Sequence, residues 1–166
     1  MISIQTHNRQ NLSVEQKEAL SKLAPLSITI SEWIEAKCRF LGKPGYMFPS
    51  LILADMLMES NFLSWQLSKE YIDGRYANNI TKIKLDSSWT GKSIEYEGIK
   101  YKTYRDWLHF ASDYSDILCF SSEYDFMLTQ PLGKQIKALS SYKNDRKWSK
   151  AKLETLIDFY NLTEID

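Results

Sequence analysis

Histidine is scarce in this sequence, and the two that occur do not form a recognisable metal site. Only His7 and His109 are present, whereas a zinc amidase or peptidase needs two or three histidine or cysteine ligands close together. Neither Cys38 nor Cys119 lies in a recognisable nucleophile setting, which argues against a cysteine–histidine peptidase. A phosphate-binding loop of the Gly-x-x-x-x-Gly-Lys type is missing too. We therefore expect no metal and no cofactor.

An excess of charge of either sign is also missing. The 21 basic residues balance the 21 acidic residues, so the formal net charge is zero. A nucleic-acid-binding protein would show a basic excess, and we expect no nucleic-acid partner. A neutral polymer such as a glycan is compatible with this balance.

Long apolar runs and a secretory signal are absent as well. No stretch approaches the roughly 20 apolar residues of a membrane span, so no membrane partner is expected. The segment Met1–His7 has neither a basic start nor an apolar run of useful length. An extracellular target would then be reached by lysis, in a virion or through a specialised secretion route, unless a leader has been removed.

The composition that is present suits one globular domain. The chain has 166 residues, 43% hydrophobic and 25% charged, enough for a sizeable core. We expect a single domain over 1–166, with packing helices in 1–48 and the motif-bearing part in 49–162. Aromatic residues reach 13%; they suit stacking on sugars, although an aromatic core explains them equally well. Cys38 and Cys119 are expected to be buried thiols, while one disulfide is also compatible with the sequence.

The most informative stretch is an apolar run from Leu51 to Met58, interrupted only by Asp55. Ser50 is placed to cap a helix here, because its hydroxyl can accept from the amides of the first turn. A helix that is apolar on nearly every side is usually the buried central helix of its domain. We therefore predict a buried helix, with Leu57 in the core.

Glu59 stands where this apolar helix ends. On local pattern alone, a solvated helix-end residue is the more common outcome. The alternative is a general acid: a carboxylic acid protonates a glycosidic oxygen near neutral pH only if its pKa is raised, and an apolar setting beside a second carboxylate raises it. Asp55 supplies that neighbour, one turn earlier on the same face.

Apolar periodicity and turn signals predict a mostly helical chain with one small β-hairpin. Pro25 is expected to end a first helix that begins after Ser13, and Glu97-Gly98 is expected to be the hairpin turn. The predicted helices are Val14–Leu23, Ser27–Phe40, Ser64–Glu70, Asp106–Phe120, one beginning near Glu123, Leu132–Leu139 and Ala151–Tyr160, and the hairpin is Ile94–Tyr104.

Four segments resemble, in order, the motifs of the bacterial glucosaminidase family, which includes autolysins, flagellar-rod hydrolases and phage lysins. They are Pro49–Phe62 with its Met-Glu-Ser, Asn78–Lys84, Trp89–Tyr104 with its Trp-Thr-Gly and Tyr-Lys-Thr-Tyr, and Ser141–Trp148. Each departs from the family pattern. Asp55 replaces a glutamine, Thr81-Lys82 replaces Phe-Gly, and Tyr101-Lys102 replaces Phe-Arg.

The resemblance implies a lysozyme-like α+β fold and hydrolysis of the β-1,4 bond after N-acetylglucosamine in peptidoglycan glycan strands. It implies that Glu59 is the acid and that the base is Glu95, Glu97 or the substrate's own 2-acetamido group. The residues expected to contact substrate are Asp55, Asn79, Trp89, Tyr104, Tyr124, Tyr142 and Trp148.

Two other functions remain open at this point. A muramidase or a lytic transglycosylase shares the lone glutamate. A degenerate glycan-binding or virion structural domain would explain the motif departures, and no wall-binding module is recognisable, which suggests a part of a larger phage or secretion assembly or a small lysin.

Overall fold

The longest element of the structure is the helix that opens its described part. The computed structural model describes residues 12–68, 71–72, 75–142 and 150–166. Helix α1 (Val14–Phe40) begins with a reciprocal capping box, in which the Gln16 N–H donates to the Ser13 hydroxyl and the Gln16 side chain accepts from the Ser13 N–H. Both bonds satisfy N–H groups that a helix start leaves open. The predicted start at Val14 is confirmed.

The predicted break at Pro25 is wrong, because α1 continues through it to Phe40. Proline removes one backbone hydrogen bond and disfavours a helix interior by ~3 kcal/mol. Pro25 lies on the exposed side of α1, where water can satisfy the carbonyl that loses its partner. On the inner side, Leu23, Leu26 and Ile30 stay in phase and are buried. Burial of this continuous stripe outweighs the local penalty.

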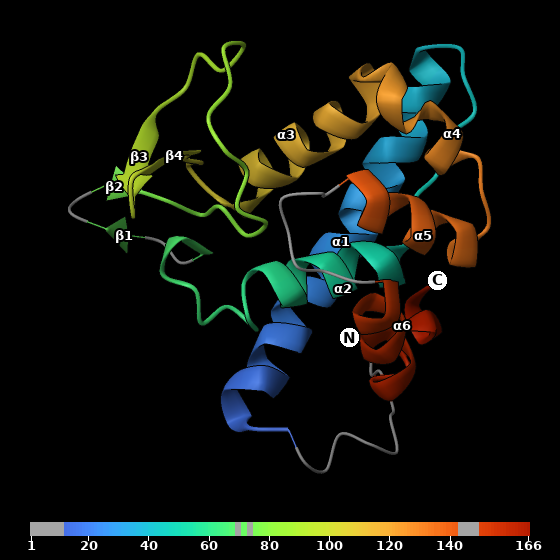
Figure 1. Ribbon diagram of the computed structural model, residues 1–166, viewed down its shortest axis with the longest axis horizontal. Coiled ribbons are helices and arrows are strands. Elements are labelled where there is room, and N and C mark those ends of the chain that lie inside the picture. The colour runs from blue at the N-terminus through green and yellow to red at the C-terminus, as the bar shows by residue number, and fades with distance from the viewer. Residues whose placement is uncertain (1–11, 69–70, 73–74, 143–149) are drawn as a thin grey trace.

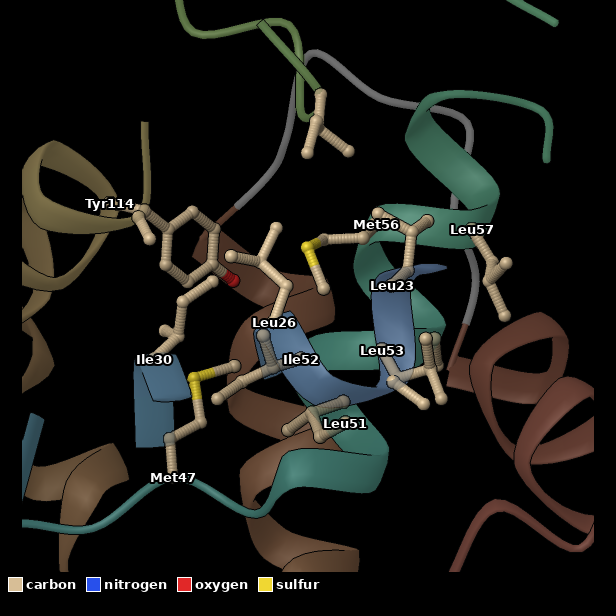
Figure 2. Packing of buried hydrophobic residues seen from close by; sticks show 14 of the residues in the cluster. Leu23, Leu26, Ile30, Met47, Leu51, Ile52, Leu53, Met56, Leu57 and Tyr114 are labelled. Atoms are coloured by element: carbon tan, nitrogen blue, oxygen red, sulfur yellow. The ribbon is translucent and has the colours of Figure 1, made fainter. Parts of the chain in front are cut away.

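Helix α2 (Pro49–Glu59) is the buried central helix that the sequence predicts. Figure 2 shows Leu51 and Leu53 of α2 in the same cluster as Leu23 of α1, with Tyr114 entering from another helix. Leu57 is fully buried, as predicted.

A residue from the far end of the described chain caps α2, so the predicted cap at Ser50 is wrong. Ser50 stands inside the first turn, after Phe48 at the N-cap position. The Asp166 carboxylate accepts from the Ser50 N–H at 2.8 Å and from its hydroxyl at 2.7 Å. First-turn amides lack helical partners and the helix dipole is positive there, so a carboxylate from elsewhere in the fold is a favourable acceptor.

A small β-lobe follows α2 in the chain. Two antiparallel pairs form it: β1 (Tyr71–Ile72) with β2 (Arg75–Tyr76), and β3 (Ser93–Tyr96) with β4 (Ile99–Lys102). Glu97 and Gly98 both have positive φ, 50° and 75°, as the tight turns of two-residue hairpins require. The predicted hairpin is confirmed, whereas the short β1–β2 pair was not predicted.

The remaining helices cover the core on two sides. Figure 1 shows α3 (Trp107–Phe120) crossing the upper half of α1, with α5 above α2 and α6 below it. The other elements are η2 (Gln66–Ser68), η3 (Ser122–Tyr124), α4 (Asp125–Leu128), α5 (Leu132–Tyr142), α6 (Lys150–Phe159) and η4 (Leu162–Ile165). The predicted helices after the hairpin are confirmed. Of the helix predicted at 64–70, residues 64–68 contain the short η2, and residues 69 and 70 lie outside the described residues.

The described elements give a mostly helical α+β arrangement with two hydrophobic clusters. The larger cluster joins the helices, and a smaller one lies under the β3–β4 hairpin. Within the described ranges, no helix is both long enough and apolar enough to cross a bilayer.

Candidate active site

The carboxyl group of Glu59 lies buried at the last turn of α2. Its residue is 1% exposed, and Asp55 one turn earlier is 3% exposed. The Tyr114 hydroxyl of α3 donates to Asp55 Oδ2 at 3.0 Å. Glu59 is therefore not the solvated helix-end residue that local pattern alone favours. The structure places two buried carboxyl groups on one face of a helix that is apolar from Leu51 to Met58 apart from Asp55.

The loop after Glu59 has an unusual backbone held by one serine. Asn61, Phe62 and Leu63 have φ values of 45°, 54° and 61°, a run of left-handed residues without a glycine. Such conformations are rare for residues with side chains and concentrate at functional sites. The Ser60 hydroxyl donates to the Met56 carbonyl at 2.6 Å and accepts from the Leu63 N–H at 2.9 Å. This arrangement gives the Glu-Ser pair a physical reason: the serine holds the turn that follows the acid.

Asn79 links the segment after α2 to the hairpin. It is fully buried, and its side-chain amide donates to the carbonyls of Ile83 and Lys102, while its Oδ1 accepts from the Ile83 N–H. Asn78 donates in the same way to the Tyr104 carbonyl at 3.0 Å. The two asparagines thus fasten the end of β4 and the residues that follow it. Contact of Asn79 with substrate stays a prediction.

Trp89 packs over the glycine of its own motif. A Cβ on Gly91 would lie 2.5 Å from the indole ring, so only glycine fits beneath it. The indole N–H donates to the Lys92 carbonyl at 2.8 Å, and the ring lies 5.4 Å from that of Tyr104. Trp89 remains half-buried. Contact of its exposed part with a sugar stays a prediction.

Tyr104 belongs to a buried network centred on Lys102, and no pattern in the sequence predicted this network. Lys102 is 2% exposed; its Nζ lies 2.8 Å from Asp86 Oδ2 and 3.2 Å from Asp113 Oδ2. The Tyr104 hydroxyl donates to Asp113 Oδ2 at 2.6 Å. Burial raises the pKa of Tyr104, so this hydroxyl keeps its proton, and the hydrogen bond from Lys102 holds the pKa of Asp86 at about 2. The network fastens the hairpin to α3, and Tyr104, fully buried, contacts other protein groups.

The two hairpin carboxylates lie on the solvent side. Glu95 is exposed and stands opposite Lys100 in the β3–β4 register, and Glu97 is exposed in the turn. The other face of the hairpin carries Tyr101, whose ring lies 5.5 Å from that of Trp65. Glu95 therefore points away from the aromatic cluster that joins the hairpin to the segment after Glu59.

The other expected substrate contacts fall into two groups. Tyr124 is half-buried in η3, next to α4. The Tyr46 N–H, shortly before the start of α2, donates to the Leu128 carbonyl of α4, so α4 lies near the N-terminal end of α2. Glu59 ends the 11-residue α2, so it lies about 15 Å along the helix from that contact. The side chain of Tyr142 and the whole of Trp148 lie outside the described residues.

A groove of about 900 Å³ runs between the first half of α1 and the start of α3. Phe62 and Leu63 of the loop after Glu59 line it, as do Asn78 and Trp107. Glu59 itself is not among its lining residues. Among the described residues, no three histidine, cysteine, aspartate or glutamate side chains gather closely enough to hold a metal ion.

Comparison with known proteins identifies the fold. No protein-family model matches the sequence, and no curated protein does. The catalytic domain of the autolysin Auto from Listeria monocytogenes matches with a TM-score of 0.68 and 20% identity, over 94% of this chain and 90% of that chain. The glycoside hydrolase domain of FlgJ from Salmonella typhimurium matches at 0.67 and 23%, over 90% of each chain. A peptidoglycan hydrolase from Sphingomonas sp. A1 matches at 0.68 and 18%, over 90% and 97%.

This chain has the fold of these hydrolase domains. The predicted lysozyme-like α+β architecture is thereby confirmed. Each match covers at least 90% of both chains, so the similarity includes the helical part and the β-lobe together. At 18–23% identity, the matches establish the fold, and the activity has to be argued from the residues.

Proposed function

We propose that this protein is a peptidoglycan hydrolase that cleaves the β-1,4 bond after N-acetylglucosamine, with Glu59 as its general acid. The observation that carries the proposal is a buried carboxyl group at the end of an apolar helix, in a fold shared with an autolysin and a glycoside hydrolase domain. An apolar setting disfavours the charged form of a carboxylic acid, which suits a group that must deliver a proton. The Met-Glu-Ser motif resembles that of the glucosaminidase family at the same glutamate.

In the proposed reaction, Glu59 gives its proton to the glycosidic oxygen as the bond from that oxygen to C1 of N-acetylglucosamine breaks. A water molecule then adds its oxygen to C1. The proton that the water loses returns to the Glu59 carboxylate, which restores the acid.

The positions of the hairpin carboxylates bear on which group acts as the nucleophile or base at C1 of N-acetylglucosamine. Glu95 and Glu97 are exposed, and Glu95 lies on the hairpin face opposite Tyr101, which packs against Trp65. This favours the substrate's 2-acetamido group as the internal nucleophile over either glutamate. Glu95→Gln and Glu97→Gln should then each keep most of the wild-type rate.

Glu59→Gln tests the proposal directly. Glutamine keeps the shape of the side chain but has no proton to deliver, so release of reducing ends from purified cell walls should fall by at least ~10²-fold. The melting temperature should hold or rise, since no charge can then form at a buried site. Glu123→Gln, at an exposed position, is the matched control. A Glu59→Gln protein with full activity would remove Glu59 from the mechanism.

Product analysis separates the related enzyme activities. Mass spectrometry of the released muropeptides should find N-acetylglucosamine at the reducing end. Reducing muramic acid would indicate a muramidase, and anhydromuramic acid would indicate a lytic transglycosylase. Wall binding with no released muropeptides of any kind would indicate a glycan-binding or virion structural domain, as the changes at Thr81-Lys82 and Tyr101-Lys102 also suggest.

The proposed place of action is the bacterial cell wall, with peptidoglycan glycan strands as the partner. Lysis, a virion or a specialised secretion route would bring the protein there, and a larger phage or secretion assembly is the proposed context. Fractionation of producing cells, with the protein followed from the cytoplasm to the wall, tests this.

A further inference from the structure

The two cysteines of the chain meet in the core between α1 and α3. Cys38 and Cys119 are 81 residues apart in sequence, yet their Sγ atoms lie 3.6 Å apart and both residues are fully buried. Figure 1 shows the C-terminal ends of α1 and α3 lying together at the top of the molecule. Gly45 packs so closely that a Cβ there would lie 2.4 Å from Cys38 Sγ. The pair is therefore held in place from a third segment.

We infer that Cys38 and Cys119 form a redox-active thiol pair that converts to an intramolecular disulfide under oxidising conditions and locks α1 to α3. The S–S bond length is ~2.05 Å, so the sulfurs need to approach by about 1.5 Å from their 3.6 Å contact. The oxidant is a small-molecule disulfide. The two thiols lose two protons and two electrons, one S–S bond forms in the protein, and the small disulfide is reduced to two thiols.

Burial controls when this reaction takes place. Burial, aided by the hydrogen bond with Cys38, raises the pKa of the Cys119 thiol to about 12. The thiolate is the form that attacks a disulfide, so the folded, reduced protein should react slowly. The crosslink should form during folding or transient opening, when the thiols meet solvent.

Helix α1 packs against both α2 and α3. A crosslink between α1 and α3 would therefore restrict the relative movement of the helices that surround Glu59. A disulfide that closes a long segment restricts the unfolded chain strongly. The inference does not depend on the proposed hydrolase activity, since it concerns only the geometry of the two thiols.

A thiol–disulfide equilibrium in the native and the unfolded chain tests the inference. The full-length protein is equilibrated with mixtures of oxidised and reduced glutathione, in buffer and in concentrated guanidinium chloride, then quenched and alkylated. Mass spectrometry counts crosslinked molecules, which take up no alkyl group. The effective concentration of the two thiols should be about 100-fold higher in the native protein, equivalent to a disulfide that stabilises the fold. An equal or lower value in the native protein would overturn the inference.

Thermal unfolding of the same samples gives a second readout. The oxidised wild type should melt several degrees above the reduced wild type, and added reductant should abolish the difference. Cys38→Ala and Cys119→Ala cannot form the crosslink and should show no response to reductant. An oxidised wild type that melts at or below the reduced one would contradict the proposed lock; this comparison stands even if a variant folds poorly.

Discussion

The hydroxyl of Tyr114 on α3 donates a hydrogen bond to Asp55 Oδ2 on α2, across 3.0 Å. Both residues are largely buried, at 7% and 3% exposure. Asp55 stands where the resembling family has glutamine, and either side chain offers an oxygen to such a donor. The bond joins the helix that carries Glu59 to the neighbouring helix, and an aspartate, unlike a glutamine, can ionise.

Asp55→Asn should change the pH dependence of hydrolysis more than the stability of the fold. An ionised Asp55 on the same helix face would favour the protonated form of Glu59 by like-charge repulsion. Without that charge, Glu59 loses its proton at lower pH, and the basic limb of the pH–rate profile should move to lower pH. Asp158→Asn, at an exposed position, should leave the profile unchanged. An unshifted profile in Asp55→Asn would limit Asp55 to packing and hydrogen bonding.

Leu57→Ala should destabilise the protein strongly, because Leu57 is fully buried in the main core. Loss of a buried leucine side chain costs ~2–5 kcal/mol, depending on how far the neighbours close the cavity. Leu108→Ala is the control, since that side chain is 57% exposed and such changes stay within about 0.5 kcal/mol. Urea unfolding of both variants measures the difference. Equal stabilities would contradict the central position of α2.

Lys102→Met should loosen the attachment of the hairpin to α3. It removes the cation from beside Asp113, whose side chain is only 15% exposed, and breaking such a pair costs ~3–5 kcal/mol. Lys100→Met, on the exposed part of the same strand, should cost about 0.5 kcal/mol or less. Lys102→Arg should recover part of the loss because it restores the charge. Similar unfolding curves for Lys102→Met and Lys100→Met would show that the network contributes little.

The ion pair between Lys102 and Asp86 should make the free energy of unfolding depend on pH in the acidic range. The hydrogen bond from Lys102, with a further bond from Ser88, lowers the pKa of Asp86 from 3.8 to about 2. A lowered folded-state pKa stabilises the protein above the unfolded-state value, and that contribution is lost as the pH falls toward about 2. The Asp86 side chain is 47% exposed, so solvent screening keeps the effect small.

Comparison with Asp86→Asn isolates this contribution. The difference in unfolding free energy between wild type and variant should be constant at neutral pH and shrink between about pH 4 and pH 2. Asp158→Asn should give a curve parallel to that of the wild type throughout. A difference that does not change with pH would exclude an ionic role for Asp86.

Local pattern predicted several elements correctly because they depend on neighbours in the chain. The helix start after Ser13, the hairpin turn at Glu97-Gly98 and the buried helix ending at Glu59 are short-range features. Pro25 shows the limit of such reasoning. A proline does disfavour a helix interior, but the apolar residues before and after Pro25 are buried against α2 and α3, and local pattern cannot show that packing. Ser50 shows the same limit, because Asp166 is 116 residues away.

The amino-acid sequence alone determined the candidate acid and the class of the fold, because an apolar helix that ends in Glu-Ser and a short hairpin are contiguous patterns. Only the tertiary structure decided which polar residues work together. Strand alternation puts Lys102 on the same face as the exposed Lys100, yet Trp89 and Asp113 cover Lys102 and leave Lys100 in water. Cys38 and Cys119 likewise meet only because α1 and α3 cross at that point. Burial and charge pairing are properties of the space around a side chain, and segments distant in the chain fill that space.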